Sequence, residues 1–229
     1  MNFKFLSLLV IAASCVTGRC GVYDFSFTGI NGAIPNGSLS GYQSSETISG
    51  ASGTIESLSV NLNVSGGFNG SLYGYLVGPS GGFVVLLNRV GVTGSNPIGY
   101  ANTGFNVTFS DSAASDIHTY QNTSYTLNGS GQLTGSWQPD GRNVSPGTVT
   151  SSSPRTSMLS SFNGLTPNGT WTLFLSDVLS GPRSSTLVGW GLQITTVPEP
   201  ANVALAIFGA AAGVIVGVQR WRRARAVRD

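Results

Sequence analysis

Short runs in which apolar and polar residues alternate recur through the middle of the chain. The clearest covers residues 58–64, where Leu and Val alternate with Ser and Asn. A period of two places neighbouring side chains on opposite faces of a strand, so this run predicts a strand with one buried face. The same pattern predicts strands at residues 23–27, 72–77, 83–87, 105–109, 133–137, 171–175 and 188–194.

Turn-forming Gly, Asn, Ser and Pro residues separate these runs, and none of the body has a sustained helical period. Many short strands divided by turns are typical of an all-β protein, so we expect one jelly-roll or β-sandwich domain over residues 21–197. Residues 120–157 have the weakest pattern and are rich in Ser, Gly, Thr and Asn. We expect them to form a long, mobile loop around one short strand.

The sequence Gly-Pro-Ser-Gly-Gly at residues 78–82 lies between two of the predicted strands and indicates a hairpin turn. Both strands are apolar on both faces, so we expect the hairpin in the middle of the core. The same five residues fit the Gly-Xaa-Ser-Xaa-Gly pattern of a nucleophile elbow. An elbow requires a helix after the turn, whereas a strand follows here, which favours the hairpin.

The N-terminus has the three parts of a secretory signal peptide within residues 1–20. A short positive segment ends at Lys4, an apolar segment covers residues 5–13, and small residues follow. Signal peptidase and the secretion machinery are therefore expected partners, with cleavage after Ser14 or Gly18. Both cysteines, Cys15 and Cys20, lie in or next to this leader, so a mature domain that loses one or both has no internal disulfide.

An uncharged apolar run covers residues 201–218 near the C-terminus. As a helix it would be roughly 27 Å long, against about 30 Å for the hydrocarbon core of a bilayer, so it predicts one transmembrane helix. A charge cluster follows, and positive charge is retained on the cytoplasmic side, which would leave the body outside the cytoplasm. The cluster comprises Arg220, Arg222, Arg223 and Arg225, with Arg228 beyond it.

Pro198, Glu199 and Pro200 stand immediately before that run. A Pro-Glu-Pro triplet, a short apolar helix and an Arg-rich end resemble the PEP-CTERM sorting signal of Gram-negative, exopolysaccharide-producing bacteria. The resemblance implies an exosortase-like sorting enzyme as a partner for residues 198–229, with removal of the helix. The protein would then be held briefly at the inner membrane and delivered to the cell surface or extracellular matrix. A permanent C-terminal anchor is the alternative.

The body carries four arginines and seven acidic residues between residues 21 and 197, a formal charge of −3. The positive net charge of the whole chain comes from its ends, so it indicates nothing about the body. A nucleic-acid-binding domain needs a basic surface, and this composition excludes one.

Two blocks resemble the P domain, or Homo B domain, that follows the catalytic domain in subtilisin-like proprotein convertases. They are VNLNVSGGFNGSLYGYLVGPSGG at residues 60–82, and FNGLTPNGTWTLFLSD at residues 162–177 together with LVGWGLQI at residues 187–194. The resemblance implies a galactose-binding-like β-sandwich. Ser71 stands where the family usually has Asp, and Gly78 where Ser is usual. Trp171 and Trp190 fall in step with apolar neighbours, so we expect both in the core.

Few side chains could support catalysis or bind a metal ion. The single histidine, His118, could be imagined as a base oriented by Asp111 or Asp116, but this composition produces such a trio by chance, and we predict no catalytic residues. P domains and other exported jelly rolls can hold calcium. Asp111, Asp116 and Asp177 are therefore the candidate ligands for Ca²⁺, and Asp177 also suits a turn.

Three functional hypotheses follow. The first is an exported, non-enzymatic protein of the cell envelope or extracellular matrix that binds an exopolysaccharide or envelope protein or serves a structural role. The second, from the P-domain resemblance, is an accessory module of a subtilisin-like serine endopeptidase. The third is a carbohydrate-binding jelly roll.

Overall fold

The computed structural model describes residues 20–198 and 200–226, without the side chains of residues 200–206, 210, 222 and 224–226. The predictions for the signal peptide and for Glu199 lie outside the described residues. The chain divides into a compact body, Cys20–Val197, and a C-terminal segment from Pro198 onward, and each is described by itself.

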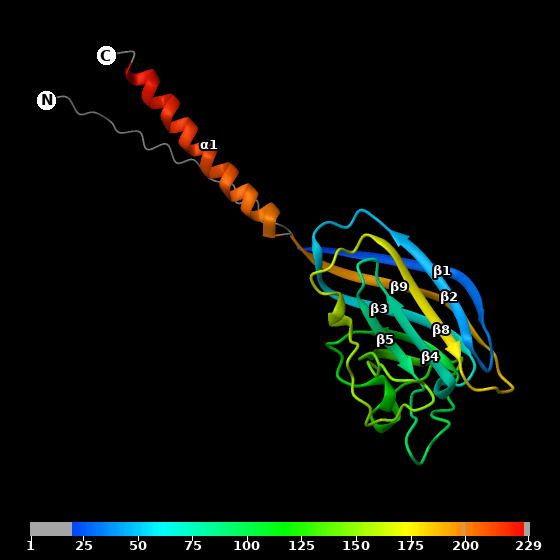
Figure 1. Ribbon diagram of the computed structural model, residues 1–229. Helices are drawn as coiled ribbons and strands as arrows, with labels where there is room; N and C mark the ends of the chain where they lie inside the picture. The colour runs from blue at the N-terminus through cyan, green and yellow to red at the C-terminus, as the bar shows by residue number, and fades with distance from the viewer. Residues whose placement is uncertain (1–19, 199, 227–229) are drawn as a thin grey trace. The chain divides into compact units, whose positions relative to one another are not determined.

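The body consists of two β-sheets (Figure 1). The first has the strand order β1-β9-β3-β6-β7 and the second β2-β8-β4-β5. Neighbouring strands are antiparallel except β6 and β7, which are parallel. The strands are β1 (Gly21–Ile34), β2 (Ser38–Ile48), β3 (Thr54–Gly66), β4 (Leu72–Val77), β5 (Phe83–Asn88), β6 (Gly104–Phe109), β7 (Leu133–Trp137), β8 (Gly169–Asp177) and β9 (Ser185–Val197).

Alternating side chains of both sheets form one apolar core. In β3, Leu58 and the three apolar residues that alternate after it are buried, as the pattern predicts. Trp171 and Trp190 are also buried, and their indole nitrogens donate to Pro167 O at 2.8 Å and Ser44 Oγ at 3.0 Å. The prediction of an all-β fold with two sheets is confirmed.

Strand β2 was not predicted from the sequence. It pairs with β8 along its length, but it contributes few apolar side chains to the core. Its sequence, SLSGYQSSETI, has no apolar alternation because the inward positions include Ser44, which accepts the Trp190 indole hydrogen bond. Because Ser44 faces the core, β2 lacks the alternation of apolar and polar residues from which strands were predicted.

The predicted hairpin is formed by β4 and β5, and Gly78 N donates to Gly82 O across its turn. We predicted that both strands lie in the middle of the core, but in β4 the alternate residues Tyr73, Tyr75 and Val77 are only half-buried. The prediction is confirmed for β5, whose residues 84–87 are fully buried although β5 is the edge strand of its sheet. Its outer residues are buried because a later segment covers them. Asp140 N donates to Leu86 O at 3.1 Å, and Val85 N donates to Ser157 O at 3.2 Å.

The weakly patterned region of residues 120–157 therefore differs from the predicted mobile loop. It contains the expected short strand β7, but the chain beyond that strand packs onto β5 and buries Asp140 and Arg142. Its Ser, Gly and Asn content reflects a chain held by hydrogen bonds to backbone atoms, which leaves no periodic trace in the sequence.

The C-terminal segment forms one helix, α1 (Pro200–Ala226), which begins at the second proline of the Pro-Glu-Pro triplet. The helix continues past residue 218 through the Arg-rich end, where Arg and Ala are good helix formers. We predicted a transmembrane helix over residues 201–218. In the part of the chain that the structure describes, no helix is long and apolar enough to cross a membrane.

Candidate functional site

His118 lies in the 3₁₀ helix η2 (Ile117–Asn122) and is fully buried. Its Nδ1 is 2.8 Å from Asp140 Oδ2, and its Nε2 is 3.0 Å from the carbonyl oxygen of Val92. Both ring nitrogens are therefore occupied within the body, one by a carboxylate and one by a backbone carbonyl, and the ring is shielded from solvent. The imagined base with Asp111 or Asp116 is therefore not formed.

His118 belongs to a charge cluster, which we define as His118, Asp140, Arg142, Asp116 and Arg155. Arg142 joins the two carboxylates, with NH2 2.8 Å from Asp116 Oδ2 and NH1 3.3 Å from Asp140 Oδ1. Burial lowers the pKa of Arg142, but its bond to Asp116 and the attraction of Asp140 outweigh this and leave the pKa raised. Arg155 flanks the cluster, with Nε 3.7 Å from Asp116 Oδ2.

The charge cluster holds separate loops together. Asp140 also accepts from the backbone N–H of Asn88 at the end of β5, and Arg142 donates to Ser151 O. Asp116 caps η2 by accepting from His118 N at 2.9 Å. The ionisable groups of this region therefore bind one another and the backbone, which is a structural role.

Arg89 is a second buried cation, placed directly after β5. Its guanidinium donates to three backbone carbonyl oxygens, those of Gly70, Pro97 and Pro146, at 3.2, 2.7 and 3.3 Å. No carboxylate among the described residues forms an ion pair with it, and burial lowers its pKa. Its backbone is left-handed, with a φ of 50°. Arg89 thus joins three loops at a position where the backbone favours glycine.

The three aspartates predicted to bind calcium lie in different surroundings. Asp111 accepts from Leu159 N at 3.1 Å and Ser160 N at 2.8 Å and so caps the 3₁₀ helix η3 (Leu159–Phe162). Asp116 pairs with Arg142, as described above. The structure does not bring them together, and the described residues contain no group of three His, Cys, Asp or Glu that could hold a metal ion.

Asp177, the third of these aspartates, is buried at the end of β8. Burial raises its pKa, although hydrogen bonds from Ser71 and Ser185 act in the opposite direction. One carboxylate oxygen, Oδ2, accepts from Ser185 Oγ at 3.3 Å, and Oδ1 has no partner in the described structure. The turn-forming role is consistent with its place between β8 and the loop before β9.

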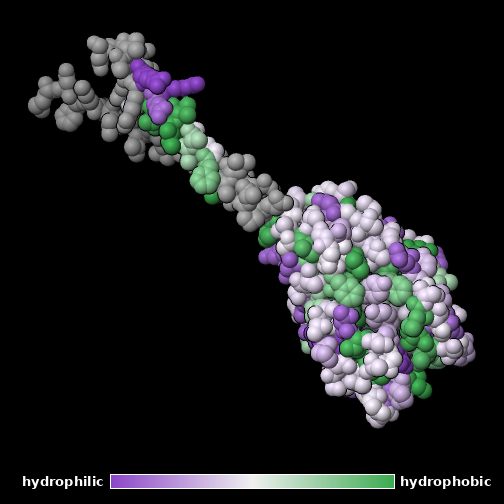
Figure 2. Space-filling model, in the orientation of Figure 1, coloured by the Kyte–Doolittle hydropathy of each residue, from purple (hydrophilic) through white to green (hydrophobic). Residues whose placement is uncertain are grey.

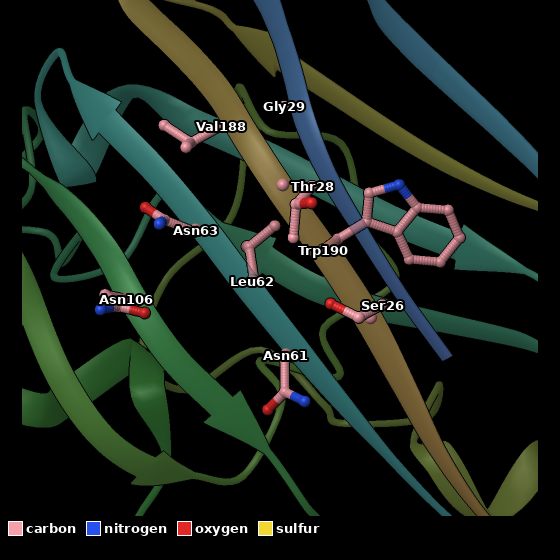
Figure 3. A pocket seen from close by; sticks show the side chains of 11 residues that line it. Ser26, Thr28, Gly29, Asn61, Leu62, Asn63, Asn106, Val188 and Trp190 are labelled. Atoms are coloured by element: carbon pink, nitrogen blue, oxygen red, sulfur yellow. The ribbon is translucent and has the colours of Figure 1, made fainter. Parts of the chain in front are cut away.

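A shallow groove of about 170 Å³ lies on the outer face of the five-stranded sheet (Figure 3). We call it the asparagine groove. Its polar lining residues come from three strands of that sheet and are all uncharged. They are Ser26 and Thr28 of β1, Asn61 and Asn63 of β3, and Asn106 of β6.

Two glycines of β9 form the floor of the asparagine groove. Gly191 lies between Ser26 and Asn61 in the sheet register, and Gly189 lies between Thr28 and Asn63. A Cβ on Gly189 would be 2.7 Å from Phe27 O, and one on Gly191 would be 2.6 Å from Phe25 O. The close approach of β1 thus requires glycine at both positions, and this leaves a furrow between two rows of polar side chains.

The side-chain amide oxygens of two asparagines in the groove already accept hydrogen bonds from neighbouring residues. Thr108 Oγ1 donates to Asn61 Oδ1 at 2.7 Å, and Gln132 Nε2 donates to Asn63 Oδ1 at 2.9 Å. Gln132 is itself buried and also donates to Val64 O at 2.9 Å. The Nδ2 donors of both asparagines, and the whole amide of Asn106, have no partner within the described residues. The groove therefore presents several free N–H donors.

The sequence had shown Asn61 and Asn63 only as polar residues between core positions. The signal that could have found the groove is the recurrence of asparagine, a residue that is depleted in strands, on adjacent strands of the sheet. Figure 2 shows that strongly hydrophilic residues are a minority on the visible face of the body.

No family model matches the chain, and no curated protein is significantly similar to it. Among solved structures, it is similar to a chain of the complex between the serine protease of Aeromonas sobria and its chaperone. That match has a TM-score of 0.42 and 15% identity, and it covers 78% of this chain and 27% of that chain. The serine protease of Aeromonas sobria crystallised alone gives a TM-score of 0.40, 17% identity and coverage of 77% and 26%.

The chain spans about a quarter of the length of these solved chains. Similarity at these TM-scores carries no argument about function. The fold is established here by the sheets and the core of the body itself.

Proposed function

We propose that the protein is an exported, non-catalytic binding protein of the cell surface or extracellular matrix, and that the asparagine groove contacts its partner. One observation carries the proposal. The ionisable groups that catalysis would need are buried against one another in the charge cluster, whereas the polar groups of the asparagine groove are uncharged and open on a sheet face. Such a surface can bind a partner but offers no nucleophile with its base.

The leader and the C-terminal segment support export. The predicted signal peptide precedes the body in the sequence, and the Pro-Glu-Pro triplet, helix and arginines follow it in the order of a PEP-CTERM signal. The proposed sorting partner is an exosortase-like enzyme that acts beside Pro198 and Pro200. Intact-mass measurement on protein from the native host tests this, because processing there removes Trp221 and the residues around it. A mature protein that retains Trp221 would contradict processing.

Binding is tested with the body, residues 20–197, which has its own core. We expect it to sediment with isolated envelope or extracellular polymer from the host and to release no product from protein, ester or glycan substrates. Failure to associate with any envelope fraction would contradict the proposal. So would a hydrolytic activity that one substitution abolishes without unfolding the body.

A second candidate function is an accessory module of a subtilisin-like serine endopeptidase. The observation that favours it is the P-domain-like sequence, whose two blocks include β4, β8 and β9 at the centre of the two sheets. Affinity capture of the body in native culture medium distinguishes this candidate. Specific enrichment of a serine protease would support it, and recovery of polymer without protease would favour the first proposal.

A further inference from the structure

We infer that the asparagine groove binds a neutral polysaccharide through the donor ends of Asn61, Asn63 and Asn106. This inference rests on the proposed function and adds to it the chemical class of the ligand and the atoms that recognise it. The geometry that carries it is the combination of free amide N–H groups, exposed hydroxyl groups and a glycine floor.

Hydrogen-bond chemistry defines the first property of the ligand. Thr108 and Gln132 occupy the amide oxygens of Asn61 and Asn63, which directs the paired donors of each side-chain amide toward a ligand. The row formed by Thr28, Gly189, Asn63 and Asn106 therefore meets its ligand mainly with donors and hydroxyl groups. A matching ligand must present many acceptor oxygens at short intervals, as sugar hydroxyl and ring oxygens do.

Charge defines the second property. No charged side chain is among the described lining residues of the groove. The nearest row of the sheet carries Asp24, paired across β1 and β9 with Gln193, whose Nε2 donates to Asp24 Oδ1 at 2.9 Å. This carboxylate stands beside the groove on the same face of β1 as Ser26, and it repels an anionic chain. The surroundings thus favour a neutral glycan over a polyuronate or a phosphate-bearing polymer.

Shape defines the third property. The floor at Gly189 and Gly191 lacks side chains, so a ring can approach the backbone between the side chains of β1 and β3. The groove is open to solvent on the sheet face and does not enclose a single sugar residue. An extended polymer that contacts the groove with internal residues fits this form better than a small metabolite, which normally binds in an enclosed pocket.

The experiment uses the body with a soluble neutral glucan and with a polyuronate of similar length. Side-chain amide signals of ¹⁵N-labelled protein report on each asparagine directly. On titration with the glucan we expect shifts in the amide signals of Asn61, Asn63 and Asn106, and weaker or no shifts with the polyuronate. The matched reference is the exposed side-chain amide of Gln43 on the other sheet, whose signal should not move.

Substitutions then test the donors. The double variant Asn63→Asp and Asn106→Asp keeps size but replaces N–H donors by acceptors, and we expect it to weaken glucan binding by at least about tenfold. Asn63→Ala with Asn106→Ala should weaken it to a similar extent. The control pair Gln43→Ala with Thr47→Ala, exposed positions of β2, should bind as the unchanged protein does. Thr28→Trp gives a further test, because it fills the groove while both asparagines remain.

The outcomes separate the inference from the proposed function. If the body binds host envelope polymer but the asparagine signals and all groove variants are unaffected, the inference is wrong and the proposed function stands. If the polyuronate binds more tightly than the glucan, the charge argument is overturned. If a captured protein rather than a glycan shifts the three amide signals, the ligand class is wrong. Association with no envelope fraction contradicts the proposed function itself.

Discussion

Two regions of the body, one fully buried and the other buried for most of its members, are held together in different ways. The core between the sheets is built from apolar side chains such as Trp171 and Leu62, whereas the charge cluster beside β5 is built from ions and hydrogen bonds. Burial stabilises the first directly. In the charge cluster, the attraction between the ions largely offsets the cost of removing them from water, so the cluster adds little net stability. The loss of one member, however, leaves the others buried and unpaired. The following substitutions test this contrast.

The largest effect is expected in the core. Trp171→Ala removes the largest fully buried side chain and the hydrogen bond to Pro167 O, so we expect a loss of about 4–5 kcal/mol in the free energy of unfolding. Trp171→Phe retains most of the volume and should cost clearly less. Denaturant unfolding measures both. Equal losses for Ala and Phe would mean that packing is not what Trp171 contributes.

In the charge cluster, Asp140→Ala leaves His118 and Arg142 buried without their shared carboxylate. We expect a loss of about 3–4 kcal/mol by the same measurement. The matched substitution is Asp116→Ala. Its carboxylate belongs to the same cluster but is 16% exposed, so water can replace it in part and the loss should be smaller. A larger loss for Asp116→Ala would reverse our account of which carboxylate is central.

Arg89 combines a buried cation with a strained backbone, and two variants separate these properties. Arg89→Ala removes hydrogen bonds to three carbonyl oxygens and keeps the left-handed backbone, so we expect a loss of about 2–3 kcal/mol. Arg89→Gly loses the same bonds but relieves the backbone, and should be about 1 kcal/mol more stable than Arg89→Ala. Identical thermal stability of the two variants would show that the backbone contributes nothing.

The smallest effect concerns Asp177. Its folded-state pKa is raised by burial, so the folded protein binds the proton more tightly than the unfolded chain. The contribution of Asp177 to the free energy of unfolding is therefore greatest below the pKa of the unfolded state. It is lost as the pH rises through the pKa of the folded state. At neutral pH, Asp177→Asn removes a buried charge, and we expect it to raise the free energy of unfolding by about 1 kcal/mol.

The control for that prediction is Thr47→Ala, on an exposed position of β2, which removes no ionisable group and should leave the pH dependence of stability unchanged. Unfolding measured at several pH values should show a weaker decrease above about pH 4 for Asp177→Asn than for the unchanged protein. A steeper decrease would mean that the carboxylate is stabilised in its ionised form, contrary to the direction given by burial.

The sequence was informative wherever apolar residues alternate in a strand. It identified β3 because Leu58 and its neighbours alternate with Ser and Asn, and it placed Trp171 and Trp190 in the core. It failed at β2, where Ser44 occupies an inward position to accept from Trp190. A polar residue chosen for one distant partner cannot be recognised from local periodicity.

The same limit applies to the charge cluster and the candidate site. His118 was a candidate base because it is the single histidine in the sequence. Its partner Asp140 lies 22 residues away, in a segment without apolar periodicity. The asparagine groove depends on the register of β1, β9 and β3, which joins residues from both ends of the body. Residue types suggested polar surfaces there, and only the pairing of the strands shows which of them meet.

The position of β9 also affects the order in which the body can be completed. It is the last strand of the body in sequence, yet it lies between β1 and β3, and Gly21 pairs with Thr196. A nascent chain that ends before residue 185 lacks the strand that pairs with both β1 and β3. Its core also lacks Trp190. The five-stranded sheet can therefore be completed only when nearly the whole body has been synthesised. A protein that crosses a membrane N-terminus first would remain open until its last strand arrives.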